Sequence, residues 1–215
     1  MVAMWSWRIG FGLLAYLLGA IPNGYWVGRL NGVDIRTQGS GNIGATNVFR
    51  CIGKGWGIFT FVLDALKGFI PAFLFPRLLA EAGAAPSGSL AVVPALAFMI
   101  LAIAGHNWPV YLGFKGGKGV ATSAGALLGV APAAVGVGLV VWLVLFFATR
   151  YVSVASIGAA LGVAAGGWWL YRQEMTLPAV LTVLCLLVIW RHKANLARLA
   201  AGTENRISLG RKEPS

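Results

Sequence analysis

Residue types that can hold a phosphate group are concentrated in the segment Gly39–Arg50, which reads GSGNIGATNVFR. Its glycines allow backbone N–H groups to converge on an anion. Serine and threonine hydroxyls can donate to phosphate oxygens, and the Arg50 guanidinium can bind two of these oxygens at once. Glycine, asparagine and serine also dominate solvated turns, so composition alone leaves a plain turn open as the alternative.

A second polar segment runs from Gly105 to Gly119, and its last six residues read FKGGKG. It leads directly into an apolar stretch. A glycine-rich loop at the start of a helix can bind phosphate, because the first N–H groups of the helix point toward the ligand. The spacing does not match a Walker A motif, which argues against a nucleoside triphosphatase. A lysine-rich cytoplasmic turn is the alternative.

A third polar segment follows the last apolar stretch and contains RHKANL at 191–196 and GTENR at 202–206. His192 and Asn195 are three residues apart, so on a helix they share one face. Lone histidines are more often structural than catalytic. His192 lies where the chain leaves the membrane, among cations, which makes a role in a site as reasonable as a structural one.

One pair of opposite charges lies inside an apolar stretch. Asp64 and Lys67 stand at positions i and i+3 among uncharged residues. Charges inside a membrane span are costly, and they are usually paired or functional. We expect an internal salt bridge that supports the fold, with a functional role as the alternative.

Several known catalytic arrangements are absent from the sequence. With two aspartates in all, Asp34 and Asp64, a carboxylate metal site is hard to build. Neither histidine begins the His-x4-Asp dyad of one large acyltransferase class, and no Gly-x-Ser-x-Gly elbow is present. The two cysteines, Cys51 and Cys185, fit neither a disulfide framework nor a metal site.

The polar segments must be positioned by a largely apolar chain. Its 215 residues are 58% hydrophobic and 11% charged, with a mean hydropathy of +0.78, whereas a soluble domain carries about 25% charge. Apolar stretches near the length of a membrane span recur along the whole chain, so a cleaved signal peptide does not explain them. We predict an all-α polytopic membrane protein that forms a single integral membrane domain, residues 1–215. The apolar stretches lie at 9–30, 56–75, 88–105, 119–149, 151–171 and 176–190.

The net charge of +11 is large for so apolar a chain and must lie where water reaches it. A basic excess can serve nucleic acid, anionic lipid headgroups or a phosphorylated substrate. The sequence has no long Lys/Arg run and no nucleic-acid motif, so nucleic acid is not an expected partner. Membrane lipid and a phosphorylated substrate are the partners that fit.

The stretch 119–149 determines the number of spans. As one helix it would be about 45 Å long, against a hydrocarbon core of about 30 Å, and Pro132 disfavours helix at the preceding residue. The alternatives are one long tilted helix, or a short helix, a turn at Pro132 and a second helix. The second alternative places thirteen lysines and arginines on one side of the membrane and three on the other, whereas the first gives seven against nine.

The positive-inside rule therefore favours the broken stretch. We predict seven transmembrane helices, one of them short, with the N-terminus outside and the C-terminus in the cytoplasm. The short piece 119–131 could be re-entrant, which preserves the same sidedness. The polar segments 31–55, 105–118 and 191–215 then lie together on the cytoplasmic face.

The three segments together resemble the acyl-phosphate-dependent glycerol-3-phosphate acyltransferase family, bacterial membrane enzymes that begin phospholipid synthesis. The matching text is GSGNIGATNVFR from Gly39, GHNWPVYLGFKGGKGVAT from Gly105 and HKANLARLAAGTENRI from His192. DALKG at 64–68 and YVSVASI at 151–157 also match, and order and spacing agree over nearly the whole chain. The tail Ser208–Ser215 and the loop 76–89 look peripheral.

The resemblance implies a seven-helix protein of the bacterial cytoplasmic (inner) membrane whose site faces the cytoplasm. It implies transfer of an acyl group from acyl phosphate to the 1-hydroxyl of glycerol 3-phosphate, giving lysophosphatidic acid and phosphate. The attack is direct, without a covalent enzyme intermediate, and no metal or organic cofactor takes part. The implied partners are the two substrates and membrane lipid. The oligomeric state is open, with a monomer as the simplest expectation.

The resemblance also implies roles for single residues. The first segment holds phosphate and orients the acceptor, the second holds the acyl phosphate, and the third completes the pocket together with Ser153. Glu204 braces the third segment rather than reacting, and Asp64 and Lys67 are structural. The predicted catalytic residues are Ser40, Arg50, Lys118, His192 and Asn195. The predicted substrate-binding residues are Asn42, Thr46, Asn47, Lys115, Gly116, Gly117, Gly119 and Ser153.

The proton acceptor for the 1-hydroxyl has two candidates. His192 is the best side chain for this task, and a phosphate of the substrate is the alternative.

Two other functions also account for part of the pattern. A transporter or flippase of an organic phosphate would need cationic loops on one side, but transporters often contain internal repeats, and no convincing repeat is visible. A membrane scaffold whose basic loops attract anionic lipid explains the charge but not the glycines and asparagines.

Overall fold

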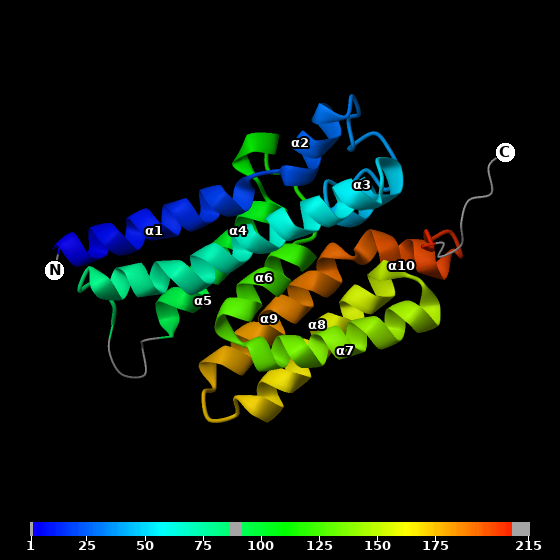
Figure 1. The fold of residues 1–215 in the computed structure, drawn as a ribbon. Coiled ribbons are helices and arrows are strands. Elements are labelled where there is room, and N and C mark those ends of the chain that lie inside the picture. Colours follow the sequence, from blue (N-terminus) through cyan, green and yellow to red (C-terminus); the bar gives the residue numbers. More distant parts are fainter. Residues whose placement is uncertain (1, 87–91, 208–215) are drawn as a thin grey trace. The chain divides into compact units, whose positions relative to one another are not determined.

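The computed structural model describes residues 2–86 and 92–207, and the secondary structure in these two ranges is helical, without a β-strand. The tail Ser208–Ser215, with two of the counted basic residues, lies outside the described residues. Residues 87–91, which include the end of the predicted peripheral loop 76–89, lie outside them as well. Contacts divide the chain into two compact units, Met1–Pro132 and Ala133–Ser215. Each unit is described by itself (Figure 1).

The first unit is arranged around one long helix. Its elements are α1 (Val2–Ala20), α2 (Asn23–Leu30), α3 (Ala45–Cys51), α4 (Lys54–Glu81), α5 (Val93–Asn107), the 3-10 turn η2 (Val110–Leu112) and α6 (Val120–Val130). The long helix α4 (Figure 1) packs against α3, α5 and α6, and α1 packs against α5. Small residues allow the closest approach, because a Cβ added to Gly125 of α6 would overlap the carbonyl oxygen of Ala65 in α4.

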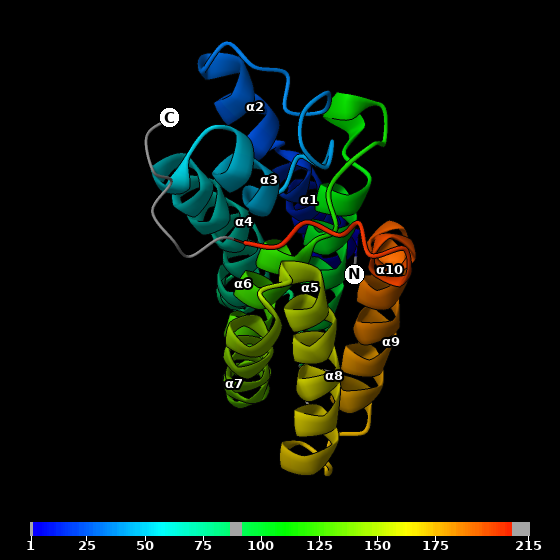
Figure 2. The same ribbon diagram turned by 90° about the vertical axis from the view of Figure 1, so that its right-hand side faces the viewer.

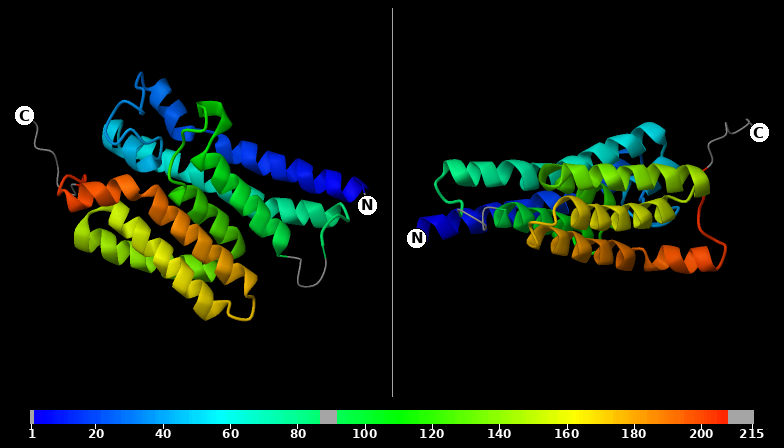
Figure 3. Two further views of the ribbon diagram at one scale, coloured as in Figure 1. Left: turned by 180° about the vertical axis from the view of Figure 1, so that it is seen from behind. Right: turned by 90° about the horizontal axis from the view of Figure 1, so that it is seen from below.

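The second unit is a helical hairpin with an additional helix at each end. Its elements are α7 (Pro132–Thr149), α8 (Val152–Leu170), α9 (Thr176–Arg191) and α10 (Lys193–Ala200). Helices α8 and α9 run side by side (Figure 2). After α10 the chain turns back toward the connection between α7 and α8 (Figure 3), where the Ile207 N–H donates to the Arg150 carbonyl at 3.0 Å.

Several of these helices are suited to a membrane. Four helical stretches in the described ranges are long and apolar enough to cross one: Lys54–Glu81, Val93–Leu112, Pro132–Thr149 and Val152–Leu170. A fifth crossing results if α9 and α10, which are bent by 53° relative to each other, form one broken span. The prediction of an all-α protein with several apolar spans is confirmed, while seven spans and the orientation of the termini stay predictions.

Prolines mark the points where two apolar stretches break. The stretch 119–149 divides into α6, which ends at Val130, and α7, which begins at Pro132, as the two-helix alternative predicts. With 11 residues, α6 is about 16 Å long, roughly half of the hydrocarbon core. The stretch 9–30 also divides, which the hydropathy pattern did not indicate: α1 ends at Ala20, and α2 begins after Pro22.

Candidate functional site

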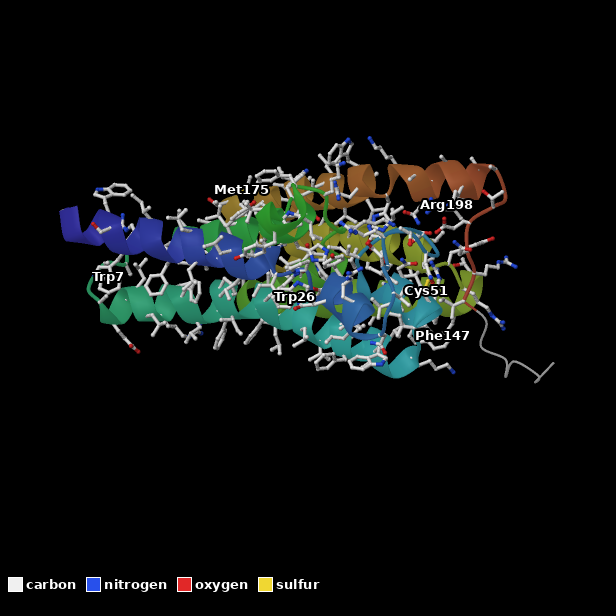
Figure 4. The ribbon with its side chains drawn as sticks, turned by 90° about the horizontal axis from the view of Figure 1, so that it is seen from above. Trp7, Trp26, Cys51, Phe147, Met175 and Arg198 are labelled. Atoms are coloured by element: carbon white, nitrogen blue, oxygen red, sulfur yellow. The ribbon has the colours of Figure 1, made fainter. Side chains whose placement is uncertain are left out.

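The first polar segment is a loop held in shape by one side chain. Asn47 in α3 is buried, and its amide nitrogen donates to the carbonyls of Ile35 at 3.1 Å and Gln38 at 3.0 Å. Its side-chain oxygen accepts the backbone N–H of Ser40 at 2.9 Å. The Sγ atom of Cys51, at the C-terminal end of α3 (Figure 4), lies 3.6 Å from the same oxygen. Asn47 therefore shapes the loop, and its contacts favour a structural role over the predicted contact with substrate.

The glycines of this loop are required by its backbone. Gly39 has a φ of 57°, a left-handed conformation, and a Cβ added there would overlap the side-chain oxygen of Asn47. The hydroxyls of Ser40 and Thr46 make no hydrogen bond within the described ranges, and both residues are half-buried. Because their hydroxyl groups are not committed to the fold, these two residues are the loop's clearest candidates for binding an anion.

We expect Asn47→Asp to destabilise the protein much more than Asn42→Asp. A carboxylate at position 47 would place an oxygen against the carbonyls of Ile35 and Gln38, and both would lose their donor. Burying an uncompensated charge and unpaired acceptors costs about 3 kcal/mol or more. Asn42 uses only its side-chain oxygen, which accepts the Gly44 N–H at 2.9 Å, and a carboxylate can accept the same bond.

Thermal unfolding of both purified variants in the same detergent measures this difference. A clear drop in Tm for Asn47→Asp with a small change for Asn42→Asp is the expected result. Equal Tm values for the two variants would contradict the assignment of Asn47 as the residue that shapes the loop.

The second polar segment folds back onto the C-terminal end of α5. The Gly117 N–H donates to the His106 carbonyl at 3.1 Å, and a Cβ on Gly116 would overlap the same carbonyl oxygen. Gly119 has a φ of 78° and lies against Asn107, so that an added Cβ would come within 2.9 Å of the Asn107 side-chain oxygen. The glycines are therefore needed for close packing as well as for any anion they bind.

The predicted passage from this loop into a helix is confirmed. Helix α6 begins at Val120, directly after Gly119, whose carbonyl accepts the Ser123 N–H at 2.7 Å. Lys115 is exposed and Lys118 is half-buried, and these two lysines flank the paired glycines. Two cations and the start of a helix are thus brought to one loop, which is an arrangement suited to a phosphate group.

The predicted internal salt bridge is present in α4. Lys67 Nζ lies 2.9 Å from the Asp64 carboxylate, and both side chains are buried. Sequence reasoning missed the other members of this cluster: Asn23 donates to the same Asp64 oxygen at 3.0 Å, and His106 Nδ1 lies 3.8 Å from it. The available signal was weak, since Asn23 is a single polar residue within the apolar stretch 9–30 and His106 directly follows the stretch 88–105.

Glu204 is the centre of a hydrogen-bond network in the second unit. Its Oε1 accepts from the Ser153 hydroxyl at 2.9 Å and from the Asn195 amide at 2.7 Å. Its Oε2 accepts from Arg198 Nε at 2.8 Å. Arg198, labelled in Figure 4, belongs to α10 and Ser153 to the first turn of α8. These contacts support the predicted bracing role, because one buried carboxylate ties both helices to the segment that follows α10.

The same network alters the acidity of Glu204. Burial alone would raise the pKa of this carboxyl, but the hydrogen bonds from Asn195, Arg198 and Ser153 outweigh it and hold the pKa below its usual value. Glu204 is therefore a stable carboxylate rather than a group poised to exchange a proton near neutral pH. Asp34 is ionised as well, because its exposed pair with Arg36 lowers the pKa to about 2.

His192 lies at the bend between α9 and α10 and is buried. Its Nδ1 is 2.8 Å from the Val188 carbonyl, an acceptor, so Nδ1 carries a proton. The lone pair of the neutral ring is then on Nε2. Asn195 is one turn further on, and its N–H donates to the His192 carbonyl at 2.8 Å. Nε2 is therefore the atom through which His192 can accept a proton.

The family model for glycerol-3-phosphate acyltransferases matches residues 9–202 of the chain. Curated proteins of that description are similar over most of their length. The one from Anaeromyxobacter dehalogenans (strain 2CP-C) is 46% identical over 193 residues, which covers 89% of this chain and 93% of that protein. The one from Aquifex aeolicus (strain VF5) is 42% identical over 201 residues, which covers 90% and 96%.

Two solved structures are also similar. The crystal structure of PlsY, an integral membrane glycerol 3-phosphate acyltransferase, in its glycerol 3-phosphate form has a TM-score of 0.82 and 38% sequence identity. The match covers 94% of this chain and 96% of that chain. The lysophosphatidic acid form has a TM-score of 0.79 and 37% identity, with coverage of 94% and 95%.

Proposed function

Because this chain belongs to the glycerol-3-phosphate acyltransferase family, we propose that it transfers an acyl group from acyl phosphate to the 1-hydroxyl of glycerol 3-phosphate. The products are lysophosphatidic acid and inorganic phosphate. The observation that carries the proposal is the family match over residues 9–202, which includes the two phosphate-suited loops and His192. The glycerol 3-phosphate and lysophosphatidic acid forms of PlsY support the acceptor and the product.

The reaction is a direct acyl transfer. The 1-hydroxyl oxygen attacks the carbonyl carbon of the acyl phosphate, the bond from that carbon to the phosphate oxygen breaks, and the hydroxyl proton passes to a base. Acyl phosphate is already activated, so no covalent enzyme intermediate is needed. Catalysis then depends on holding two anionic groups together and neutralising their charge, which are tasks for cationic and hydrogen-bonding side chains.

In the first unit the two loops take one phosphate group each. Ser40, Thr46 and Arg50, with Asn42, bind the acceptor's phosphate, and their loop keeps its shape through Asn47. Lys115 and Lys118, with the backbone of the glycines between and after them, bind the acyl phosphate. Two observations support this assignment. The hydroxyls of Ser40 and Thr46 make no hydrogen bond within the described ranges, and helix α6 begins directly after the second loop.

In the second unit His192 is the proton acceptor, through Nε2, and Asn195 and Ser153 orient the substrates. The geometry refines the last two roles, because both side chains already donate to Glu204. Each side chain also carries an oxygen of the accepting type, the hydroxyl oxygen of Ser153 and the amide oxygen of Asn195. Glu204 fixes both side chains in place and does not itself react.

The membrane arrangement that fits this function has seven spans in a single membrane domain, residues 1–215. The N-terminus is outside, and the segments 31–55, 105–118 and 191–215 face the cytoplasm of a bacterial inner membrane. The strong bias of basic residues toward these segments supports this orientation. A monomer is the simplest arrangement of this chain.

An assay with purified protein tests the proposal. The protein in detergent or lipid mesophase is given palmitoyl phosphate and glycerol 3-phosphate, without metal or ATP, and phosphate release is measured. Release that depends on glycerol 3-phosphate is expected, whereas palmitoyl thioester as the donor should give no product. The blank is the same reaction without the acceptor. Release that is equal with and without glycerol 3-phosphate would overturn the proposal.

A further inference from the structure

A cluster of buried polar side chains lies among the helices of the first unit, below the lysine-bearing loop. Asp64 receives Lys67 Nζ at 2.9 Å and the Asn23 amide at 3.0 Å. Lys67 also donates to the Ile21 carbonyl at 2.6 Å, where the break between α1 and α2 exposes a backbone acceptor. The imidazole of His106 is 3.8 Å from the same Asp64 oxygen and is 4% exposed. Three helical segments thus converge on one carboxylate.

The other side of the His106 ring supports the loop. A Cβ added to Gly117 would overlap Nε2 of the ring and lie 2.9 Å from Cε1 and 3.0 Å from Cδ2. The ring therefore packs directly against the Gly117 backbone, with no space between them for a methyl group. The His106 carbonyl accepts the Gly117 N–H at 3.1 Å, so this residue contacts the loop through both its ring and its backbone.

We propose that His106 is a positioning residue for the loop that carries Lys115 and Lys118. The Asn23–Asp64–Lys67 cluster fixes the ring, and the ring fixes the backbone of Gly116 and Gly117 between the two lysines. This proposal rests on the proposed function, in which that loop binds the acyl phosphate. His106 itself touches neither substrate and transfers no proton.

The cost of a polar cluster inside a membrane supports a specific role. Charged side chains in a span are expensive, and they persist where they are paired and contribute to a site. The Asp64–Lys67 pair alone would satisfy both charges within α4. The additional contacts with Asn23 and His106 extend the cluster to the break after α1 and to the end of α5, directly beneath the loop.

A double-mutant cycle between His106 and Gly117 tests the proposal. We expect His106→Ala to raise the KM for palmitoyl phosphate about 10-fold, with a smaller change in kcat. Gly117→Ala in the otherwise native protein should lower kcat/KM about 100-fold, because its methyl group overlaps the ring and displaces the loop. The His106→Ala variant lacks the ring, so adding Gly117→Ala to it should lower kcat/KM by less than about 3-fold.

Gly113→Ala is the matched control in the same loop. Gly113 has a left-handed φ of 57°, unlike Gly117, and an added Cβ there meets no atom within 4 Å. Its effect should therefore be the same in the native and His106→Ala backgrounds. The positioning role would be overturned if Gly117→Ala, like Gly113→Ala, lowered kcat/KM by the same factor in the His106→Ala background as in the native protein.

Hydrogen exchange gives a second readout that needs no activity. In the purified protein without substrate, His106→Ala should speed exchange of the Gly117 amide, which donates to the His106 carbonyl, and leave α8 and α9 unchanged. Unchanged exchange at Gly117 would overturn the proposal. If the His106→Ala variant does not accumulate in the membrane, the His106→Ser variant, which also removes the ring, is used in its place. If the native protein releases no phosphate, the proposed function is contradicted. The positioning role of His106 is then still tested by hydrogen exchange, which needs no activity.

Discussion

His192→Ala is expected to lower kcat/KM for glycerol 3-phosphate by about 10²–10⁴-fold, the usual contribution of a general base. The proton of the 1-hydroxyl must leave during acyl transfer, and in the proposed mechanism Nε2 of His192 accepts it while Nδ1 donates to the Val188 carbonyl. The loss should be greatest where the native ring is neutral. In the native protein the rate should rise with pH as the imidazolium loses its proton. A plot of rate against pH for His192→Ala should lack that rise.

Two conservative variants separate proton transfer from positioning. His192→Asn can keep the donor to the Val188 carbonyl but has no atom at the position of Nε2, whereas His192→Gln can place an amide near that position. If His192 is the base, both variants are as inactive as His192→Ala. Substantial activity in His192→Gln would instead assign a hydrogen-bonding role. A His192→Ala rate within a few-fold of the native rate would leave a substrate phosphate as the proton acceptor. Lys193→Ala, an exposed neighbour, is the control.

Glu204→Ala is expected to lower the stability of the protein by about 2–3 kcal/mol, seen as a fall in Tm of roughly 5–10 °C. The substitution removes the acceptor for Ser153, Asn195 and Arg198, and two of these donors are buried. The estimate is below that for a fully buried ion pair, because Arg198 is one-third exposed. Activity should fall as well, since the Ser153 and Asn195 side chains lose their fixed orientation.

The stability that Glu204 provides should also depend on pH. Its pKa in the folded protein is below the usual 4.5 because hydrogen bonds to the carboxylate outweigh burial. The contribution is therefore complete above about pH 4.5 and is lost as the pH falls through the folded-state pKa. Tm of the native protein should fall on acidification, and Glu204→Gln, which cannot titrate, should lack that part of the fall. A Tm curve unchanged by Glu204→Gln would contradict this account.

Asp34→Ala is the control for both measurements. Asp34 is also ionised and paired with an arginine, and its pKa of about 2 is likewise lowered. Its pair with Arg36 is exposed, however, and exposed ion pairs add little to stability. A small change in Tm is expected for Asp34→Ala, so a fall as large as that of Glu204→Ala would show that charge alone, without burial, produces the effect.

Local spacing in the sequence was sufficient to predict the parts of this protein that lie within one helix or one loop. The Asp64–Lys67 pair followed from an i,i+3 spacing, because helix geometry places such residues side by side. The break at Pro132 followed from the steric effect of proline on the preceding residue and from the distribution of basic residues. The chemistry of the three polar segments followed from their residue types, and their text was enough to identify the family.

Only the tertiary structure assigned the long-range contacts. Glu204 meets Ser153 across 51 positions and Asn23 meets Asp64 across 41, and neither spacing has a local period that a sequence reveals. The same reason explains why the sequence did not reveal the structural contacts of Asn47 and His106. The family resemblance implied that Asn47 binds substrate, and the structure adds that its side-chain amide makes hydrogen bonds to backbone groups 7 to 12 residues away. Residue type determines which hydrogen bonds a side chain can make, and packing of the chain determines which partner receives them.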